Sequence, residues 1–219
     1  MPNIILGVTG GIAAYKVADL AGTLVKEDFI VKVIMTESAK KFITPLTLAT
    51  MSRNPVYDDA AEWTADGTIK HIELAKWCDL FVVVPATANT IAKMARGIAD
   101  NLLTSTYLAL PFEKSQILVC PAMNTRMWDA ERTKENLELI KNKFRIKILS
   151  PEEGLLACGD VGMGKLPSVR TIVGTIKSYF GKNYEVKGIT KDYYGEKIDY
   201  CQTDRDLTEY YCDKVQSSY

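Results

Sequence analysis

The chain has 219 residues, of which 47% are hydrophobic and 25% are charged, a composition typical of a globular protein with a substantial core. Its 27 basic and 27 acidic residues cancel, so the charge balance argues against nucleic-acid binding by phosphate neutralisation and against a role at a membrane surface. No apolar run reaches the length of a transmembrane helix.

The N-terminus carries no basic leader and no cleavage site, so we expect a first strand there rather than a signal peptide. The cysteines form an odd, scattered set without a Cys-x-x-Cys pair, namely Cys78, Cys120, Cys158, Cys201 and Cys212. This pattern predicts reduced thiols and a cytoplasmic protein. One histidine and unclustered cysteines cannot assemble a usual zinc ligand set, so we expect no metal.

Short β-branched apolar runs alternate along the chain with stretches of helical period. Strands are predicted over 4–8, 30–35, 80–84, 116–120 and 146–149, and helices over 13–26, 45–51, 69–77, 90–96, 101–110, 131–143 and 169–180. Nearly continuous apolar strands alternating with helices indicate a parallel sheet covered on both faces. We therefore predict an α/β fold, a doubly wound parallel sheet of Rossmann-like or flavodoxin-like topology.

The character of the sequence changes near residue 182. Residues 183–219 are rich in tyrosine and charge and have no clear period of two or 3.6. We predict one domain over 1–182 and a poorly ordered C-terminal tail over 183–219.

Small polar residues and glycines follow four of the predicted strands. They are Thr9–Gly11, Thr36–Ser38, Pro85–Thr90 and Pro121–Asn124. Because ligands of open α/β sheets bind beyond the carboxyl ends of the strands, we expect these segments to converge on one site. Backbone N–H groups at helix starts and short neutral donors suit a phosphate and a polyol chain.

The first of these segments is ambiguous by itself. Thr9-Gly10-Gly11 does not match the dinucleotide fingerprint, and no acidic residue closes the second strand, so a mononucleotide is favoured over NAD. A tight turn that binds nothing is the alternative at this loop. Asn89, Thr90 and the pair Asp100-Asn101 also have an alternative, as helix caps.

Five segments make the sequence recognisable: Pro85–Thr90, Gly97–Thr104, Pro121–Trp128, the His-Ile-Glu-Leu stretch beginning at His71, and the Ala-Cys-Gly-Asp loop around Cys158. Together they resemble the homo-oligomeric flavin-containing cysteine decarboxylases, over residues 3 to about 180. The closest resemblance is to the branch that acts on 4′-phosphopantothenoyl-L-cysteine in coenzyme A biosynthesis.

The resemblance implies FMN as cofactor and a redox-assisted decarboxylation. In the family, oxidation of the substrate's cysteine to a thioaldehyde creates an electron sink, CO2 leaves, and the enethiolate is reduced again. The residues implied in FMN binding are Gly10, Gly11, Ile12, Thr36, Ser38, Thr87, Ala88, Asn89 and Thr90.

The resemblance also implies three catalytic residues, His71, Asn124 and Cys158. The imidazole of His71 would act as base or proton shuttle, although a lone histidine is more often satisfied by a nearby carbonyl. Asn124 would hold the scissile carboxylate through a neutral amide. Cys158 would supply the proton of the reductive step from a flexible glycine-rich flap, the alternative being a buried inert thiol.

Two further residues are candidate substrate contacts, Met123 and Lys165, the latter for a phosphate. Met127 and Trp128 are more typical of wall and core, and Cys78 and Cys120 of core thiols. The family assembles as trimers, sometimes as tetramers of trimers, with flavin sites at subunit interfaces, so a homo-oligomer is implied.

Three questions stay open at the level of sequence. Relatives that decarboxylate the C-terminal cysteine of lantibiotic-type peptides lack the flap cysteine, so Cys158 argues against that substrate. Non-catalytic FMN-binding regulatory subunits tend to lose one of the three catalytic residues, and this chain has all three. Many bacterial members continue into a ligase domain near residue 182, and residues 183–219 are hypothesised to be a remnant of its start.

Overall fold

The structure is a computed structural model that describes residues 1–63, 67–141, 145–181, 188–192 and 195–199. The chain divides into two compact units, Met1–Ile172 and Val173–Tyr219. The first unit contains the main sheet and all of the predicted site residues, and each unit is described by itself. In the part of the chain that the structure describes, no helix is long and apolar enough to cross a membrane.

A six-stranded parallel sheet forms the centre of the first unit, in the order β3-β2-β1-β4-β5-β6. The strands are β1 (Asn3–Val8), β2 (Ile30–Met35), β3 (Val56–Tyr57), β4 (Leu80–Ala86), β5 (Gln116–Pro121) and β6 (Ile146–Ile148). This is the strand order of a doubly wound Rossmann-like sheet, and its order reverses between β1 and β4. The predicted fold class is confirmed, and β3 is an additional strand of two residues.

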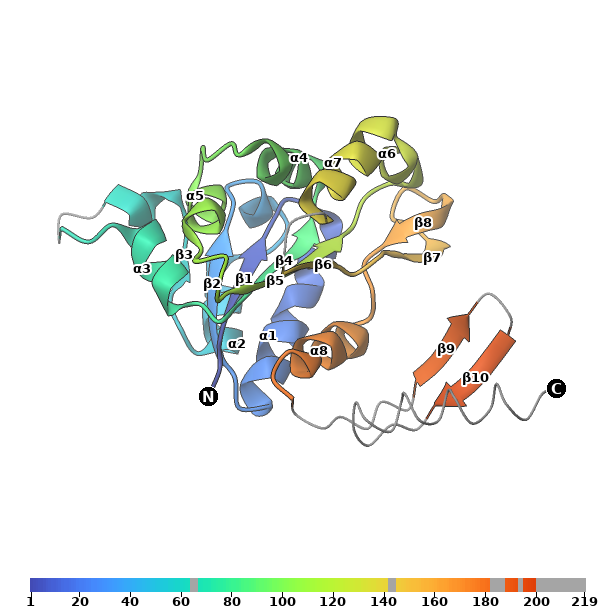
Figure 1. Ribbon diagram of the computed structural model, residues 1–219, viewed down its shortest axis with the longest axis horizontal. Helices are drawn as coiled ribbons and strands as arrows, with labels where there is room; N and C mark the ends of the chain where they lie inside the picture. Colours follow the sequence, from blue (N-terminus) through green and yellow to red (C-terminus); the bar gives the residue numbers. More distant parts are fainter. Residues whose placement is uncertain (64–66, 142–144, 182–187, 193–194, 200–219) are drawn as a thin grey trace. The chain divides into compact units, whose positions relative to one another are not determined.

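Helices cover both faces of this sheet (Figure 1). On one face α1 (Lys16–Lys26), which continues the short η1 (Ile12–Tyr15), contacts α2 (Pro45–Ser52). On the other, α5 (Leu102–Ala109) contacts α3 (Lys70–Trp77) and α4 (Ala88–Arg96), and α4 contacts α7 (Glu131–Lys141). Two further 3₁₀ turns are η2 (Ala39–Lys41) and η3 (Asp59–Trp63). Residues 142–143 of the predicted 131–143 helix lie outside the described residues.

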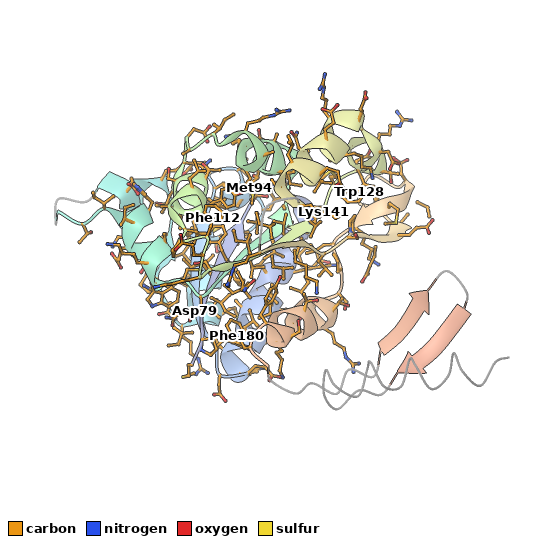
Figure 2. The ribbon with its side chains drawn as sticks, in the orientation of Figure 1. Asp79, Met94, Phe112, Trp128, Lys141 and Phe180 are labelled. Atoms are coloured by element: carbon orange, nitrogen blue, oxygen red, sulfur yellow. The ribbon has the colours of Figure 1, made fainter. Side chains whose placement is uncertain are left out.

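A hydrophobic core lies between the sheet and the helices α3, α4, α5 and α7. Its strand residues alternate along β4, because every second side chain points to the same face of the sheet. Phe81 and Val83 on β4 and Val119 on β5 are fully buried and pack with Met94 of α4 and Tyr107 of α5. In Figure 2 the labelled Met94 belongs to this core and the labelled Phe112 packs against it. Burial of such side chains stabilises the fold by roughly 1.5–3 kcal/mol each, so the sheet is a rigid support for the loops at its edge.

The glycine-rich segment is a β-hairpin rather than the loop that the sequence suggests. Its strands β7 (Glu152–Leu155) and β8 (Val161–Lys165) pair in antiparallel fashion, with Gly154 opposite Gly162. The sequence prediction also missed the short helix α6 (Thr125–Asp129), which β8 contacts. Glycines are poor strand formers, so alternation rules did not reveal these strands.

Helix α8 (Val169–Ser178) runs across the boundary between the two units. Within residues 183–219 the structure describes an antiparallel pair, β9 (Gly188–Asp192) and β10 (Gly195–Asp199). The rest of the predicted tail lies outside the described residues. Its predicted poor order, its boundary near residue 182 and its origin as a ligase remnant stay predictions.

Candidate active site

A cavity of about 440 Å³ opens at the carboxyl ends of β1, β4 and β5. It is walled on one side by the loop after β1 and on the other by the β7–β8 hairpin. The lining residues are Gly10, Gly11, Ile12, Ala13, Tyr15, Lys16, Thr87, Ala88, Ala122, Met123, Asn124, Met127, Leu155, Leu156, Ala157, Cys158, Gly164, Lys165 and Leu166. Its position agrees with the rule that open α/β sheets bind ligands at the point where the strand order reverses.

A buried hydroxyl joins two of the strand ends at this cavity. Thr9 is 1% exposed, donates its hydroxyl to the carbonyl of Pro85 at 2.6 Å and accepts from the backbone N–H of Thr87 at 3.1 Å. Thr87 in turn caps α4 by accepting from the N–H of Thr90 at 3.3 Å. The ends of β1 and β4 are therefore fixed relative to each other.

Glycine at position 10 allows the loops after β1 and β2 to meet. A Cβ added to Gly10 would lie 2.4 Å from Cβ of Ser38 and 3.0 Å from its carbonyl carbon. No side chain caps η1, which begins directly after Gly11. Its first N–H groups and the glycine backbone form an approach suited to a phosphate. These backbone donors fit the phosphate of a flavin nucleotide.

The predicted cofactor residues separate into two sets. Gly10, Gly11, Ile12, Thr87 and Ala88 line the cavity. Thr36, Ser38, Asn89 and Thr90 are not among its lining residues. Ser38 supports Gly10, whereas the hydroxyl of Thr36 accepts from the N–H of Ala39 at 3.3 Å. The cofactor roles of all nine residues stay predictions.

Of the helix caps considered as alternatives for the sequence, the one at Asn101 is confirmed and the others are wrong. Thr87 caps α4, so Asn89 and Thr90 do not. Asn101 caps α5 by accepting from the N–H of Thr104 at 3.0 Å. Asp100 pairs instead with Lys93 at 2.6 Å, and this pairing holds the pKa of the Asp100 carboxyl below its usual value.

The β7–β8 hairpin lies against the segment that follows β5, as Figure 1 shows beside α6. The N–H of Met123 donates to the carbonyl of Gly164 at 3.0 Å. A Cβ added to Gly164, whose φ is +141°, would lie 2.1 Å from the carbonyl oxygen of Met123, and one added to Gly162 would lie 2.6 Å from Oγ1 of Thr125. These two glycines let the hairpin approach closely.

The hairpin brings Cys158 to Asn124. Nδ2 of Asn124 donates to Sγ of Cys158 at 3.1 Å and to Oδ2 of Asp160 at 3.1 Å. Oδ1 of Asn124 accepts from the N–H of Arg126 at 2.8 Å and so caps α6. This cap fixes the side-chain amide with its NH2 group toward the thiol, and Asn124 and Cys158 both line the cavity.

His71 lies on α3 and is held by Glu62 of η3. Its Nδ1 is hydrogen-bonded to Oε1 of Glu62, and its backbone N–H donates to Oε2 of the same carboxylate at 3.1 Å. The side chain of His71 is 27% exposed. A carboxylate on Nδ1 orients the ring and leaves Nε2 for proton exchange. Glu62 was not among the residues singled out in the sequence.

The three predicted catalytic residues form two separate groups within one chain. Asn124 and Cys158 line the cavity, and His71 is absent from its lining. Figure 1 shows α3 and the β7–β8 hairpin toward opposite ends of the sheet. A single copy of the chain therefore does not bring the imidazole to the amide and the thiol.

The remaining described thiols are core residues. Cys78 and Cys120 are buried and free, whereas Cys158 is exposed. Burial raises the pKa of Cys78 to about 12 and raises that of Cys120 further, so neither is nucleophilic near neutrality. Among the described thiols, Cys158 is therefore the one available to chemistry.

The predicted substrate residues Met123 and Lys165 both line the cavity, and Lys16 lines it as well. Lys16 donates from Nζ to the carbonyl of Leu166 at 3.4 Å. The two lysines give the cavity a positive contribution that favours anionic ligands. Lys16 was not singled out in the sequence, and Asp160 was named only as part of the segment around Cys158. Thr9 was expected near the site as part of the segment Thr9–Gly11. Lys16 could have been expected near the site from its position in the sequence, because it lies about one helical turn after Gly11.

Known proteins resemble this chain in sequence over most of its length. The chain is 48% identical over 175 residues to a "Probable phosphopantothenoylcysteine decarboxylase" of Streptococcus mutans, covering 80% of this chain and 97% of that protein. It is 43% identical over 180 residues to the "Coenzyme A biosynthesis bifunctional protein CoaBC" of Bacillus subtilis. That alignment covers 82% of this chain but 43% of the bifunctional protein.

Two solved structures share the fold. A PPC decarboxylase mutant complexed with pantothenoylaminoethenethiol superposes with a TM-score of 0.75 and 33% identity, over 82% of this chain and 98% of the other. "The FMN binding protein AtHal3" does so with a TM-score of 0.73 and 33% identity, over 84% and 98%. The Flavoprotein family model matches residues 1–181. The chain belongs to the Flavoprotein family.

Proposed function

We propose that the chain is an FMN-dependent phosphopantothenoylcysteine decarboxylase, which converts 4′-phosphopantothenoyl-L-cysteine to 4′-phosphopantetheine in coenzyme A biosynthesis. The observation that carries the proposal is the contact between Asn124 Nδ2 and Cys158 Sγ at 3.1 Å on a cavity whose glycine-rich wall fits FMN. The names of the Streptococcus mutans relative and of the solved PPC decarboxylase support the substrate. The FMN-binding structural relative supports the cofactor.

When bound, the flavin supplies two-electron chemistry, which makes the substrate's cysteine carbon an electron sink and later reduces the decarboxylated product. Asn124 holds the scissile carboxylate. Its amide is neutral, so it orients the carboxylate without adding the stabilisation of a full positive charge. Oδ1 is occupied by the N–H of Arg126, so the amide offers Nδ2 as its donor, and the carboxylate would replace one of the bonds that Nδ2 makes to Cys158 and Asp160.

Two proton transfers complete the proposed reaction. His71, oriented through Nδ1 by Glu62, exchanges a proton with the substrate thiol at Nε2. Cys158 donates the proton that accompanies the reductive step, so that the product is a saturated thiol and not an enethiol. Lys165, at the same cavity, is the proposed contact for the substrate phosphate, and Met123 is a wall of the site.

We further propose that the working enzyme is a homo-oligomer, a trimer or a tetramer of trimers, whose sites are shared between copies. The separation of His71 from Asn124 and Cys158 within one chain supports this arrangement. Apolar side chains exposed at the cavity support it too, Tyr15 at 59% and Leu155 at 69%. A cytoplasmic location is proposed from the free thiols Cys78, Cys120 and Cys158.

Subunit complementation tests two points together: whether the sites are shared between copies of the chain, and whether the reaction needs His71 and Asn124. The variants His71→Asn and Asn124→Asp are each expected to lose CO2 release from 4′-phosphopantothenoyl-L-cysteine. Mixed oligomers formed by refolding the two variants together should regain part of the activity, because some interfaces then combine a native His71 with a native Asn124. Homogeneous samples of each variant, refolded in parallel, are the controls.

Three results would count against the proposal. Full loss in the mixture, with flavin bound, would place each complete site within one chain. Release of CO2 from a peptide ending in cysteine, but none from 4′-phosphopantothenoyl-L-cysteine, would assign the chain to peptide substrates. Flavin binding without turnover of either compound would favour a regulatory subunit.

A further inference from the structure

The side chains of Asp160, Asn124 and Cys158 all contact one another at the cavity. A single carboxylate oxygen, Oδ2, lies 3.3 Å from Sγ of Cys158 and 3.1 Å from Nδ2 of Asn124. The third side of the triangle is the Asn124–Cys158 contact at 3.1 Å. Neither the proposed catalytic residues nor the proposed cofactor residues include Asp160.

The turn of the hairpin holds the two side chains together. The N–H of Leu156 donates to the carbonyl of Asp160 at 2.8 Å, and the N–H of Gly159 donates to the carbonyl of Leu156 at 2.9 Å. Gly159, between Cys158 and Asp160, has φ +88°, a conformation that L residues rarely adopt. The tight turn therefore places the thiol of Cys158 and the carboxylate of Asp160 next to the same amide group, that of Asn124.

The donors and acceptors assign the direction of each bond. Oδ1 of Asn124 is occupied by the N–H of Arg126, so its two amide hydrogens point to Sγ and to Oδ2. An ionised carboxylate can only accept. The hydrogen of the Cys158 thiol is therefore donated to Asp160, with Oδ2 as its acceptor.

Three cationic side chains belong to the cavity or to the helix that Asn124 caps. Lys16 and Lys165 line the same cavity, and Arg126 follows Asn124 on α6. The polar contacts that the structure gives to Sγ are those to Asn124 and Asp160. Sγ therefore lies between one donor, Nδ2 of Asn124, and one acceptor, Oδ2 of Asp160.

We propose that Asp160 is a positioning residue that holds the hydrogen of the Cys158 thiol in place for the reductive half of the reaction. The proposal rests on the proposed function. In that half, the S–H bond breaks as a C–H bond forms at the enethiolate carbon. Sγ, left as a thiolate, regains a proton from solvent, and the hydride that balances the reduction comes from the flavin. Asp160 is neither consumed nor oxidised.

The first test needs no substrate. The flavin-loaded full chain is alkylated with neutral iodoacetamide or anionic iodoacetate, and modification of the Cys158 peptide is followed by mass spectrometry. The variant Asp160→Asn is compared with Glu153→Gln, which removes the same charge from an exposed position of the same hairpin. Two charges about 4 Å apart in water interact by about 1 kcal/mol. The iodoacetate-to-iodoacetamide rate ratio should rise roughly three- to tenfold in Asp160→Asn and stay unchanged in Glu153→Gln.

The second test uses 4′-phosphopantothenoyl-L-cysteine. With Asp160→Asn, part of the product should be lighter by CO2 and two further hydrogens, because protonation of the enethiolate fails in those turnovers. Asp160→Glu, which keeps the carboxylate, should restore the saturated product and the native alkylation ratio. An unchanged alkylation ratio, or a changed ratio with fully saturated product, would overturn the proposal.

The two tests separate this inference from the proposed function. If no variant and no native protein consumes the substrate, the function is wrong, whereas the alkylation ratio still reports on the contact between Asp160 and Cys158. If the native protein forms saturated product and Asp160→Asn does so equally, the function holds and the role of Asp160 is wrong.

Discussion

Asn124 and Cys158 are 34 residues apart in the sequence, yet the amide of one donates to the sulfur of the other at 3.1 Å. The contact depends on a hairpin that approaches the segment after β5 closely enough for the N–H of Met123 to bond to Gly164. It joins the group proposed to hold the carboxylate to the group proposed to deliver a proton. The two halves of the reaction therefore share one side of the cavity.

Replacing Asn124 with Asp should abolish decarboxylation without disturbing α6. Aspartate can still cap the helix by accepting from the N–H of Arg126, so the fold is preserved. It loses the NH2 donor and places a negative charge beside the substrate's carboxylate and Asp160. We expect CO2 release to fall on the order of 10²- to 10³-fold, as for loss of an oriented donor at a reacting group. Flavin absorbance should stay native, and a variant with more than a tenth of native activity would exclude this role.

Replacing Glu62 with Gln should weaken the action of His71. The carboxylate that orients Nδ1 becomes a neutral amide, so the ring loses a charge-assisted hydrogen bond. We expect kcat to fall on the order of tenfold, less than the full contribution of a positioned acid or base. Glu73→Gln, which lies on α3 with His71 and pairs with Lys70, is the matched control and should leave kcat unchanged.

A double variant decides whether Glu62 acts through His71. If it does, Glu62→Gln combined with His71→Asn should be no slower than His71→Asn alone. Additive losses in this cycle would instead assign Glu62 an independent role.

Replacing Gly164 with Ala should disrupt the packing of the β7–β8 hairpin against the segment after β5. The new Cβ would lie 2.1 Å from the carbonyl oxygen of Met123 at a φ of +141°, so strain and a steric clash with the backbone combine. We expect a loss of more than about 2 kcal/mol in the stability of the hairpin, seen as faster proteolysis within 152–165. Gly159→Ala has a positive φ but no atom within 4 Å of the added Cβ, and it should cost only about 1 kcal/mol. Equal proteolysis of the two variants would contradict the clash.

Replacing Thr9 with Val should weaken the connection between the ends of β1 and β4 beside the cavity. The buried carbonyl of Pro85 and the N–H of Thr87 would each lose their bond to the Thr9 hydroxyl. The free energy of unfolding should fall by about 1–3 kcal/mol, and flavin affinity should fall with it. Thr50→Val, at an exposed position of α2, removes a hydroxyl bonded to the carbonyl of Leu46 and is the control. Denaturant titration and fluorescence quenching of added FMN measure the two effects.

The sheet could be predicted from the sequence because its strands are continuous apolar runs. Leu80–Val84 and Gln116–Cys120 are bounded by helices of clear period, and the observed strands differ from the predicted ones by a residue or two at their ends. β3 was missed because two residues at a sheet edge carry too little pattern. The hairpin was missed because Gly154, Gly162 and Gly164 have no side chains to alternate.

The site was harder to predict than the fold. The strand-end rule located Gly10, Thr87 and Asn124 because their place follows from the topology of the sheet. The bonds of Asp160 to Asn124 and of Glu62 to His71 depend on turns and loop packing, which have no sequence period. The separation of His71 from the cavity was also out of reach, because it depends on which end of the sheet α3 covers.

The most direct test of the account is the mass of the product that the native protein forms from 4′-phosphopantothenoyl-L-cysteine. A product lighter by CO2 alone is predicted, since Asn124 supports decarboxylation and Cys158 supports the return of hydrogen. A product lighter by CO2 and two hydrogens would contradict the role of Cys158. Unchanged substrate in the presence of bound flavin would contradict the proposed function itself.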